Sequence, residues 1–171
     1  MTDVDLRSLR LRPGDEQLVE KEIALLGFEL GGQAYEPDPA HVTVALKVAQ
    51  TISGAVLHLR FDAHLTGPCV RCLAPATLDL HIVAHEYQDS KLGPMDDLST
   101  VYVEDDVLDL SQWAHDEVAL ALPEQILCRD DCAGLCPACG RDLNLEPHTH
   151  EEAAVDPRWQ ALADLRDRIV P

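Results

Sequence analysis

Four cysteines, Cys128, Cys132, Cys136 and Cys139, fall within twelve residues of a chain that has six cysteines among 171 residues. The Cys-Pro-Ala-Cys-Gly run places two thiolates two residues apart, and this spacing lets both sulfurs reach one tetrahedral ion. Gly140 lets the backbone fold over so that its amides donate hydrogen bonds to the bound sulfurs. The density and spacing of these cysteines indicate a metal site, and zinc is the ion expected for such ligands.

Four further residues of ligand type accompany this run. Cys69 and Cys72 have the same two-residue gap, and His148 and His150 follow the run at a distance typical of ligand loops. The eight residues together suffice for two four-coordinate ions. A disulfide framework is the rival interpretation, but it is typical of small secreted chains. Residues 1–12 lack the apolar stretch and cleavage site of a signal peptide, which favours a cytoplasmic protein.

Other chemistry is not indicated by the sequence. We find no Gly-rich dinucleotide fingerprint, phosphate loop or nucleophile elbow, and no run near the about 18 apolar residues of a membrane span. Four thiolate or imidazole ligands leave no open position for a catalytic water, so we expect no enzyme. Five scattered histidines are expected to be surface or packing residues and not catalysts: His41, His58, His64, His81 and His85.

The charge of the chain is strongly acidic, with 13 basic against 31 acidic residues and a formal net charge of −18. Residues 86–131 carry thirteen acids against Lys91 and Arg129. This stretch would repel a phosphate backbone and attract a basic partner, although a plain solvated surface also accounts for it. The candidates for partner binding on this surface are Asp105, Asp106 and Asp109.

Strands in the first half of the chain are predicted to position the first cysteine pair. Apolar residues alternate with more polar ones over 42–48, 56–65 and 78–84, which predicts three strands. The first two are separated by a Ser53-Gly54 turn, and the Cys69–Cys72 turn caps a hairpin of the last two. A redox-active Cys-x-x-Cys pair opens a helix in a βαβ unit, so a position between strands disfavours that role.

The second half is predicted to be helical in part. Short strands are expected at 100–103 and 107–110, and Ser111 is predicted to cap a helix over 112–122. Asp156-Pro157 opens a final helix by its cap and first-turn proline.

The sequence therefore predicts an α+β fold with a mostly antiparallel β-sheet in the first half, two or more C-terminal helices and a cysteine-rich zinc-binding segment. Residues 1–127 would form a β-rich core with a helix. Residues 128–171 would supply the metal-binding segment and a C-terminal helix packed on the same domain.

The order of the motifs resembles a known family. Cys-Val-Arg-Cys-Leu at 69–73, Leu-Ala-Leu-Pro at 120–123, Gly-Leu-Cys-Pro at 134–137 and Asp-Pro-Arg at 156–158 look like the YceD-type family of large ribosomal RNA subunit accumulation proteins. The resemblance covers roughly residues 40–165. It implies a bacterial, cytoplasmic, non-enzymatic protein needed for the accumulation of large-subunit ribosomal RNA, with its gene often beside that of a large-subunit ribosomal protein.

The resemblance also implies a ligand pairing. Some similar proteins lack the Gly-Leu-Cys-Pro segment but keep the early cysteine pair and ligand-type residues near Cys128 and Cys132, which implies one site made of Cys69, Cys72, Cys128 and Cys132. The second site would then hold Cys136, Cys139, His148 and His150, where similar proteins tend to carry a late Cys-x-Cys in place of the two histidines. Spacing alone allows the four clustered cysteines to share one ion nearly as well.

The expected partner is a large-subunit pre-ribosomal particle, with no membrane and no small-molecule substrate. Contact would run through a basic ribosomal protein or through a local RNA contact, for which Arg71 on the cysteine turn and Arg7, Arg10 and Arg12 near the N-terminus are the candidates. The alternative function is a thiol-based redox or zinc-responsive regulatory protein, which predicts reversible zinc release with disulfide formation. A metal-dependent hydrolase acting on RNA is a third interpretation.

Overall fold

The structure, a computed structural model, describes residues 3–89 and 100–150. The chain divides into two compact units, Met1–Cys132 and Ala133–Pro171. Among the described residues, no helix combines the length and the apolar character needed to cross a membrane.

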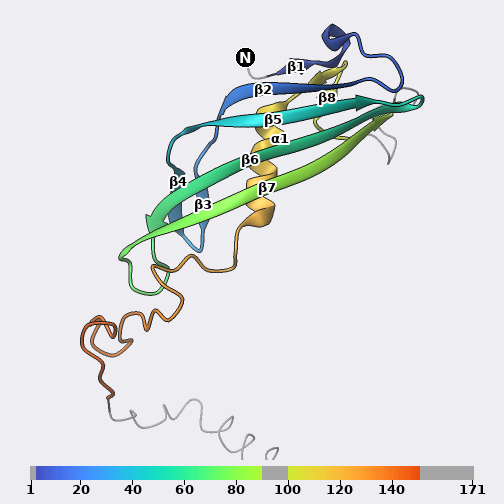
Figure 1. The fold of residues 1–171 in the computed structure, drawn as a ribbon. Helices are drawn as coiled ribbons and strands as arrows, with labels where there is room; N and C mark the ends of the chain where they lie inside the picture. The colour runs from blue at the N-terminus through green and yellow to red at the C-terminus, as the bar shows by residue number, and fades with distance from the viewer. Residues whose placement is uncertain (1–2, 90–99, 151–171) are drawn as a thin grey trace, which may run out of the picture. The chain divides into compact units, whose positions relative to one another are not determined.

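The first unit is built on a six-stranded antiparallel sheet (Figure 1). Its strands run in the order β2-β5-β6-β4-β3, and β7 lies along the other side of β6. The strands are β2 (Glu16–Ala24), β3 (Phe28–Leu30), β4 (Gln33–Pro37), β5 (His41–Gln50), β6 (Gly54–Pro68) and β7 (Pro75–Asp89).

The long β6–β7 hairpin is the central feature of this sheet. Its register is unbroken from the Gly54–Asp89 pair to the Pro68–Pro75 pair. Because successive side chains on a strand point to opposite faces, the odd-numbered residues of β6 from Leu57 to Leu65 fill the core. The predicted strands at 56–65 and 78–84 and the turn between them are confirmed.

Three strands of the main sheet that precede residue 41 were not predicted. β2 buries only Ile23, and Lys21 stands between Val19 and Ile23 on the same face, so its apolar alternation is weak. β3 and β4 are joined by Gly31-Gly32, which both adopt positive φ angles of 61° and 77°. A two-residue hairpin turn of this kind requires left-handed backbone, which glycine adopts without steric cost.

A second, three-stranded sheet has the order β1-β9-β8 and contains β1 (Val4–Asp5), β8 (Val103–Glu104) and β9 (Val107–Leu108). A short 3-10 helix, η1 (Leu6–Leu9), follows β1. The strands of this sheet are shorter than the predicted ones at 100–103 and 107–110, because Val101 and Tyr102 form a turn before β8 and α1 begins at Leu110 directly after its cap. Asp105 and Asp106, both with positive φ, form the turn between β8 and β9.

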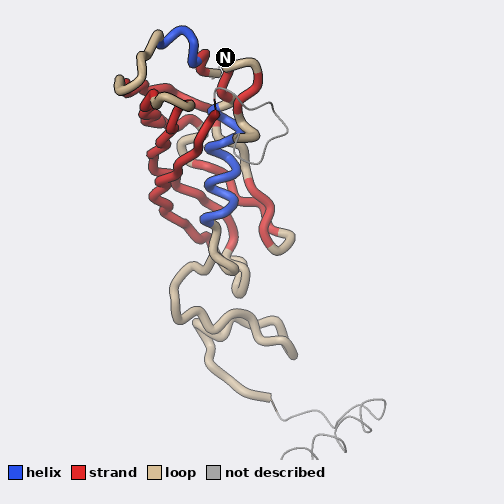
Figure 2. Tube along the Cα trace, turned by 90° about the vertical axis from the view of Figure 1, so that its right-hand side faces the viewer, coloured by secondary structure: helices blue, strands red, loops and turns tan. Residues whose placement is uncertain are grey.

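The single α-helix of the described residues, α1 (Leu110–Ala121), lies against one face of the main sheet (Figure 2). Its apolar side buries Leu110, Trp113, Ala114 and Val118. The helix begins two residues earlier than its predicted Ser111 cap implies. Asp109 is the cap, and its carboxylate accepts a hydrogen bond from the backbone N–H of Gln112 at 2.9 Å.

The predicted fold class is wrong in its helices. Two or more C-terminal helices were predicted, but the described residues contain α1 alone, and 123–150 is a succession of turns. The backbone groups of this segment bond locally into turns, as in the hydrogen bond from Gly140 N–H to the Cys136 carbonyl at 2.8 Å. Closely spaced prolines and glycines prevent a continuous helical ladder there. The predicted helix from Asp156 lies outside the described residues.

Candidate metal centres

The turn between β6 and β7 is fixed by backbone hydrogen bonds and holds the first cysteine pair. Cys69 N–H donates to the Ala74 carbonyl at 2.7 Å, and Leu73 N–H donates to the Cys69 carbonyl at 2.9 Å. The Tyr35 hydroxyl on β4 donates to the Pro68 carbonyl at 2.8 Å, immediately before the turn. These contacts set the backbone of the turn that carries the two cysteines.

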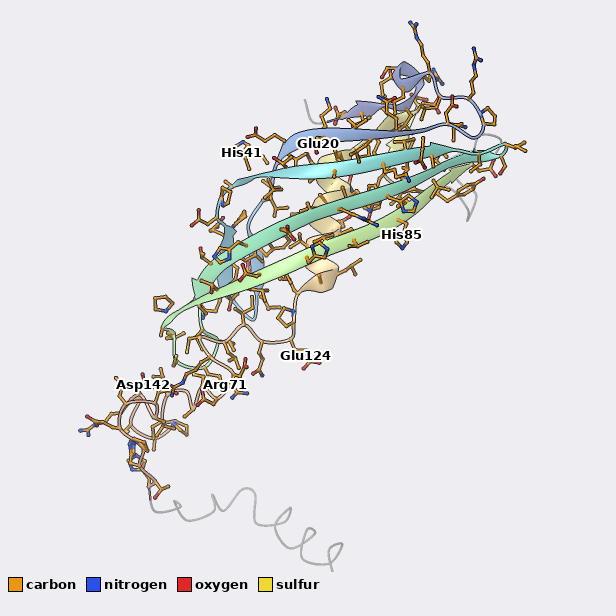
Figure 3. The ribbon with its side chains drawn as sticks, in the orientation of Figure 1. Glu20, His41, Arg71, His85, Glu124 and Asp142 are labelled. Atoms are coloured by element: carbon orange, nitrogen blue, oxygen red, sulfur yellow. The ribbon has the colours of Figure 1, made fainter. Side chains whose placement is uncertain are left out.

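The segment after α1 is tied to this turn by two sets of hydrogen bonds. Val70 N–H donates to the carbonyl of Ile126, a buried residue, at 3.0 Å. The guanidinium of Arg71 donates to the Cys132 carbonyl at 3.1 Å and to Oε1 of Gln125 at 3.1 and 3.2 Å (Figure 3). Arg71 thus bridges the cysteine turn and the segment that carries Cys128 and Cys132.

Cys69, Cys72, Cys128 and Cys132 form the first ligand group, with all four Sγ atoms within 4.8 Å of one another. The Sγ–Sγ distances are 3.8 Å between Cys69 and Cys132 and 3.5 Å between Cys72 and Cys128. A tetrahedral zinc ion with Zn–S bonds of about 2.3 Å separates its sulfurs by about 3.8 Å. All four cysteines are free thiols, and their spacing fits one four-coordinate ion.

The thiols of this group differ in acidity. Burial by itself would raise the pKa of Cys69, but backbone N–H groups of Cys128, Cys72 and Arg71 interact with the sulfur and lower its pKa to about 6. The hydrogen bond between Cys72 and Cys128 raises the pKa of Cys128 to about 12. Cys69 is therefore the thiol most readily available as a thiolate for an incoming cation.

Cys136, Cys139, His148 and His150 form the second ligand group, whose ligand atoms also lie within 4.8 Å of one another. Nε2 of His148 lies 3.1 Å from Sγ of Cys139. Nδ1 of the same ring lies 2.6 Å from the Glu146 carbonyl, which accepts a hydrogen bond from it. That bond places the proton on Nδ1 and leaves Nε2 free to bind a metal.

A tight turn presents the cysteines of the second group. Gly140, at φ 73°, lets the chain reverse, and Cys136 N–H donates to the Arg141 carbonyl at 2.8 Å. Backbone N–H groups of Cys139 and Ala138 interact with Sγ of Cys136 and lower its pKa to about 6. Each group thus contains one thiol whose pKa is lowered toward neutrality.

The two groups differ in burial. Cys69, Cys72 and Cys132 belong to the hydrophobic core of the first unit, with exposed fractions of 0%, 9% and 1%. In the second group only Cys136 is buried, and Cys139 is exposed. A metal in the first group would therefore tie core segments together, while a metal in the second would organise its own loop.

The acidic residues predicted to bind a partner lie around the β8–β9 turn. Asp105 and Asp106 form the turn, and Asp106 makes an ion pair with Arg7. Asp109 caps α1. Asp106 and Asp109 thus have structural contacts of their own, and the partner-binding role of all three residues stays a prediction.

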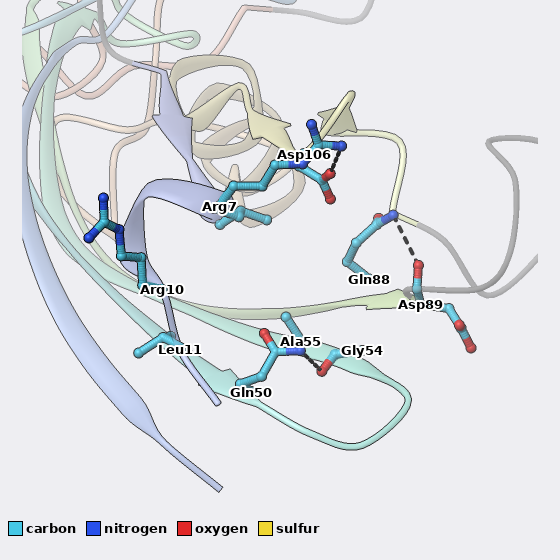
Figure 4. Close-up of a pocket in the computed structure, with 10 residues that line it drawn as sticks. Arg7, Arg10, Leu11, Gln50, Gly54, Ala55, Gln88, Asp89 and Asp106 are labelled. Atoms are coloured by element: carbon cyan, nitrogen blue, oxygen red, sulfur yellow. Dashed lines mark hydrogen bonds and ion pairs between the residues drawn. The ribbon is translucent and has the colours of Figure 1, made fainter. Parts of the chain in front are cut away.

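The predicted basic patch near the N-terminus lies beside a shallow hollow of about 200 Å³ (Figure 4). Arg7 and Arg10 line this hollow together with the amide side chains of Gln50 and Gln88. Since the carboxylate of Asp106 offsets the charge of Arg7, the hollow is a weaker site for an anion than the sequence indicates.

The sequence did not reveal the contacts that position the ligands, Tyr35 to Pro68 and Arg71 to Gln125. It also missed two cross-strand pairs on the outer face of the β6–β7 hairpin. Nδ1 of His64 lies 2.5 Å from Oδ1 of Asp79, and Nδ1 of His81 lies 2.6 Å from Oδ1 of Asp62. The hairpin register would have found these pairs, because it places each histidine directly opposite its aspartate.

The fold and the ligand groups define a β-sheet protein with two thiol-containing candidate metal centres, in the pairing that the family resemblance implies. The chain belongs to the family described as large ribosomal RNA subunit accumulation protein YceD, whose family model matches residues 57–166. This match spans the cysteine turn, α1 and both ligand groups.

Similar proteins occur in several bacteria. Uncharacterized proteins of Mycobacterium tuberculosis and Mycobacterium bovis are 34% identical over 170 residues, which cover 95% of this chain and 80% of theirs. An uncharacterized protein of Mycobacterium leprae is 31% identical over 177 residues, covering 98% of this chain and 78% of its own. The uncharacterized protein YlbN of Bacillus subtilis is 29% identical over 111 residues, which cover 61% of this chain and 64% of YlbN. No solved structure matches the chain.

Proposed function

We propose that this protein is a non-enzymatic, cytoplasmic factor that supports the accumulation or assembly of large-subunit ribosomal RNA and that holds structural zinc in both ligand groups. Membership of the family named for this role is the observation that carries the proposal. The two ligand groups, each able to hold one metal ion, support the structural zinc.

The chemistry of the ligand groups supports a structural metal. Four protein ligands complete a tetrahedral shell, and a catalytic zinc ion keeps one position open for water. Thiolate and imidazole ligands at this spacing favour zinc over the harder cations that prefer oxygen. The net charge of −18 supports a basic ribosomal protein as the main contact on the pre-ribosomal particle.

Elemental analysis of gently purified protein tests the metal. We expect about two zinc ions per chain, because each group offers four ligands. The C69S and C136S variants should each lose about one equivalent. A reproducible single equivalent in the native protein would contradict the two-site arrangement.

Measurement of ribosomal RNA in cells that lack the gene tests the function. We expect the ratio of large-subunit to small-subunit RNA to fall, and the native gene to restore it. An inactive control is a gene in which all four cysteines of the first group are serine. An unchanged RNA ratio in cells without the gene would overturn the proposed function.

The exposure of the second group favours a second candidate, a redox-responsive regulator. Hydrogen peroxide would oxidise the thiolates of Cys136 and Cys139 to a disulfide, with two protons consumed, the peroxide reduced to two waters and the bound ion released. Zinc release from this group by mild peroxide, reversed by dithiothreitol and accompanied by a change in ribosomal RNA, would favour this function. Retention of both ions would exclude it.

A further inference from the structure

The outer side of β7 is a long sheet edge. β7 pairs with β6 along all fifteen of its residues, and no strand within residues 3–89 and 100–150 pairs with its other side. Near the C-terminal end of the strand, Thr100 N–H donates to the Tyr87 carbonyl at 3.2 Å. Within the described residues, the edge from Pro75 to about Glu86 therefore has no strand partner. Figure 1 shows β7 at the border of the sheet.

This edge lacks the features that usually prevent strand pairing. Edge strands are commonly protected by lysine, by proline within the strand or by a bulge. β7 has an unbroken register, no lysine, and proline only at its first residue. The six residues Leu80–His85 carry no formal charge when the histidines are neutral. Another edge strand, β2, has four charged residues among nine: Glu16, Glu20, Lys21 and Glu22.

The side chains along β7 offer apolar contacts on both faces of the sheet. Val83, in the middle of the strand, is 47% exposed on the outer face. Leu78 and Leu80 are partly buried on the inner face, beside the core. An added strand would place alternate side chains against these two surfaces.

The surroundings of this edge are acidic. Asp79 stands on the outer face and Glu86 on the inner face of β7, and α1 contributes Asp116 and Glu117 nearby. Burial together with the charges of Asp116, Glu86 and Glu117 raises the pKa of Tyr102 to about 12, which reports the local negative potential. A segment that binds here gains by carrying positive charge.

We propose that the free edge of β7 binds an extended, lysine- or arginine-rich segment of a partner protein as an added β-strand. Main-chain hydrogen bonds supply affinity, and the acids around the strand select a basic segment. A second copy of the chain would bring another net charge of −18, and RNA would bring phosphates, so both are repelled. The choice of a basic protein rests on the proposed function.

A synthetic peptide tests the binding mode. The probe is a twelve-residue peptide of alternating lysine and valine, which matches the strand period and carries positive charge. We expect binding to the full-length protein and slower hydrogen exchange of β7 amides. A control peptide of equal charge, with proline at alternate valine positions, cannot form the hydrogen-bonded ladder and should bind at least about tenfold more weakly.

Two matched variants locate the contact. V83K places a lysine in the middle of the β7 edge, where it repels the probe and protects the edge. L18K makes the same change on β2, at a residue that is 61% exposed. We expect V83K to weaken peptide binding about tenfold and L18K to leave it nearly unchanged, with melting temperatures verifying that both variants fold.

Several outcomes would overturn the proposal: equal binding of the two peptides, equal binding by V83K and native protein, or slower exchange on β2 instead of β7. A cellular arm separates this proposal from the proposed function. If V83K loses the peptide but fully restores ribosomal RNA, the edge has no role in that function, which itself stands. If cells without the gene have normal ribosomal RNA, the proposed function fails even where the peptide binds.

Discussion

Arg71 shows how one side chain connects two distant parts of the ligand group. Its guanidinium bonds to the Cys132 carbonyl and to Gln125, so that the segment after α1 is held against the β6–β7 turn. Only a planar fork of donors reaches both acceptors at once, and a lysine ammonium lacks this geometry. In the described structure Arg71 is therefore a positioning residue of the first ligand group.

We predict that R71A destabilises the first unit and speeds metal loss from the first group. It removes three hydrogen bonds at about 0.5–1.5 kcal/mol each, partly offset by water because the side chain is exposed, so a loss of about 1–3 kcal/mol is expected. Thermal unfolding and the rate of zinc transfer to a chelator measure these effects, and R71K should be intermediate.

The matched control for this prediction is R60A, on the exposed outer face of β6. It removes the same side chain from the middle of β6, at a distance from the cysteine turn that follows the strand. Equal zinc transfer rates in R71A and R60A would show that the hydrogen bonds of Arg71 do not hold the ligand segment in place.

At the residue scale, the ligands could be found in the sequence but their supports could not. Cysteine spacing identifies atoms that can share an ion, because the chain between them is too short to place the sulfurs far apart. The bond from Arg71 to Gln125 joins residues 54 positions apart. Such a contact depends on how α1 and the hairpin pack, and no local pattern reports it.

At the scale of elements, the first ligand group joins a hairpin turn to the segment after α1, and both belong to the core. Metal binding there restrains two distant parts of the chain, so its free energy adds to the stability of the whole unit. The second group closes a loop between residues 136 and 150. Its metal should stabilise that loop alone.

We predict that C69S lowers the global melting temperature and that C139S does not. A loss of about 3 kcal/mol from the first group corresponds to about 10 °C for a chain of this size. Calorimetry measures the transition, and hydrogen exchange locates any loosening. Similar local effects of both substitutions, with the β6–β7 amides still protected, would contradict the role of the first group as a link across the chain.

Tyr102 gives a prediction for the contact between α1 and the loop before β8. Burial and the charges of Asp116, Glu86 and Glu117 raise its pKa from 10.0 to about 12. Between these two values the unfolded chain loses the tyrosine proton and the folded chain keeps it. The stability contributed by this group is therefore full below pH 10 and lost as the pH rises toward 12.

We predict that Y102F reduces the loss of stability between pH 10 and 12. Absorbance near 295 nm should show a late tyrosine component to which Tyr102 contributes near pH 12. Tyr35, whose pKa is raised by burial, also titrates late, so Y102F should reduce this component and leave the contribution of Tyr35. Y87F serves as the control. A native titration curve with the late component unaffected by Y102F would disprove the assignment.

A strand could be predicted from the sequence where apolar and polar residues alternate strongly along it. β5, β6 and β7 bury every second side chain against the core, and their period of two is plain in the sequence. β2 has Lys21 between Val19 and Ile23 on the same face and lacks this pattern. The helix cap was misplaced by two residues because Asp109 and Ser111 are both good caps, and the β9 strand decides between them.

At the scale of the whole molecule, the net charge of −18 determines which partners can approach. Attraction to a basic protein extends over a screening length of about 10 Å near 0.1 M salt and shortens as salt is added. Composition predicts this property directly, because it requires only a count of charges. Composition does not show which acids are free to act, and the ion pair of Asp106 and the cap formed by Asp109 come only from the fold.

The exposed acids of the β8–β9 turn therefore supply the sharpest test of partner contact. We predict that E104Q combined with D105N weakens association with pre-ribosomal particles about threefold to tenfold, because two negative charges facing a basic partner are removed. Asparagine also tolerates the left-handed backbone at residue 105, where φ is 50°, so the turn should be preserved. Particle sedimentation at two salt concentrations measures the effect, which should shrink at the higher concentration.

Two further variants separate the acidic surface from its neighbours. D109N retains a good helix cap and removes one charge, so it should have a smaller effect than the double change. R10Q combined with R12Q removes the exposed N-terminal arginines beside the ion pair of Arg7, and it should leave association nearly unchanged if a basic protein is the partner. A different result would show that the basic residues bind RNA: release of the particle by the arginine changes, no effect of the acidic changes, and tight binding to purified large-subunit RNA. Phosphate recognition requires the arginine cations and gains nothing from the carboxylates.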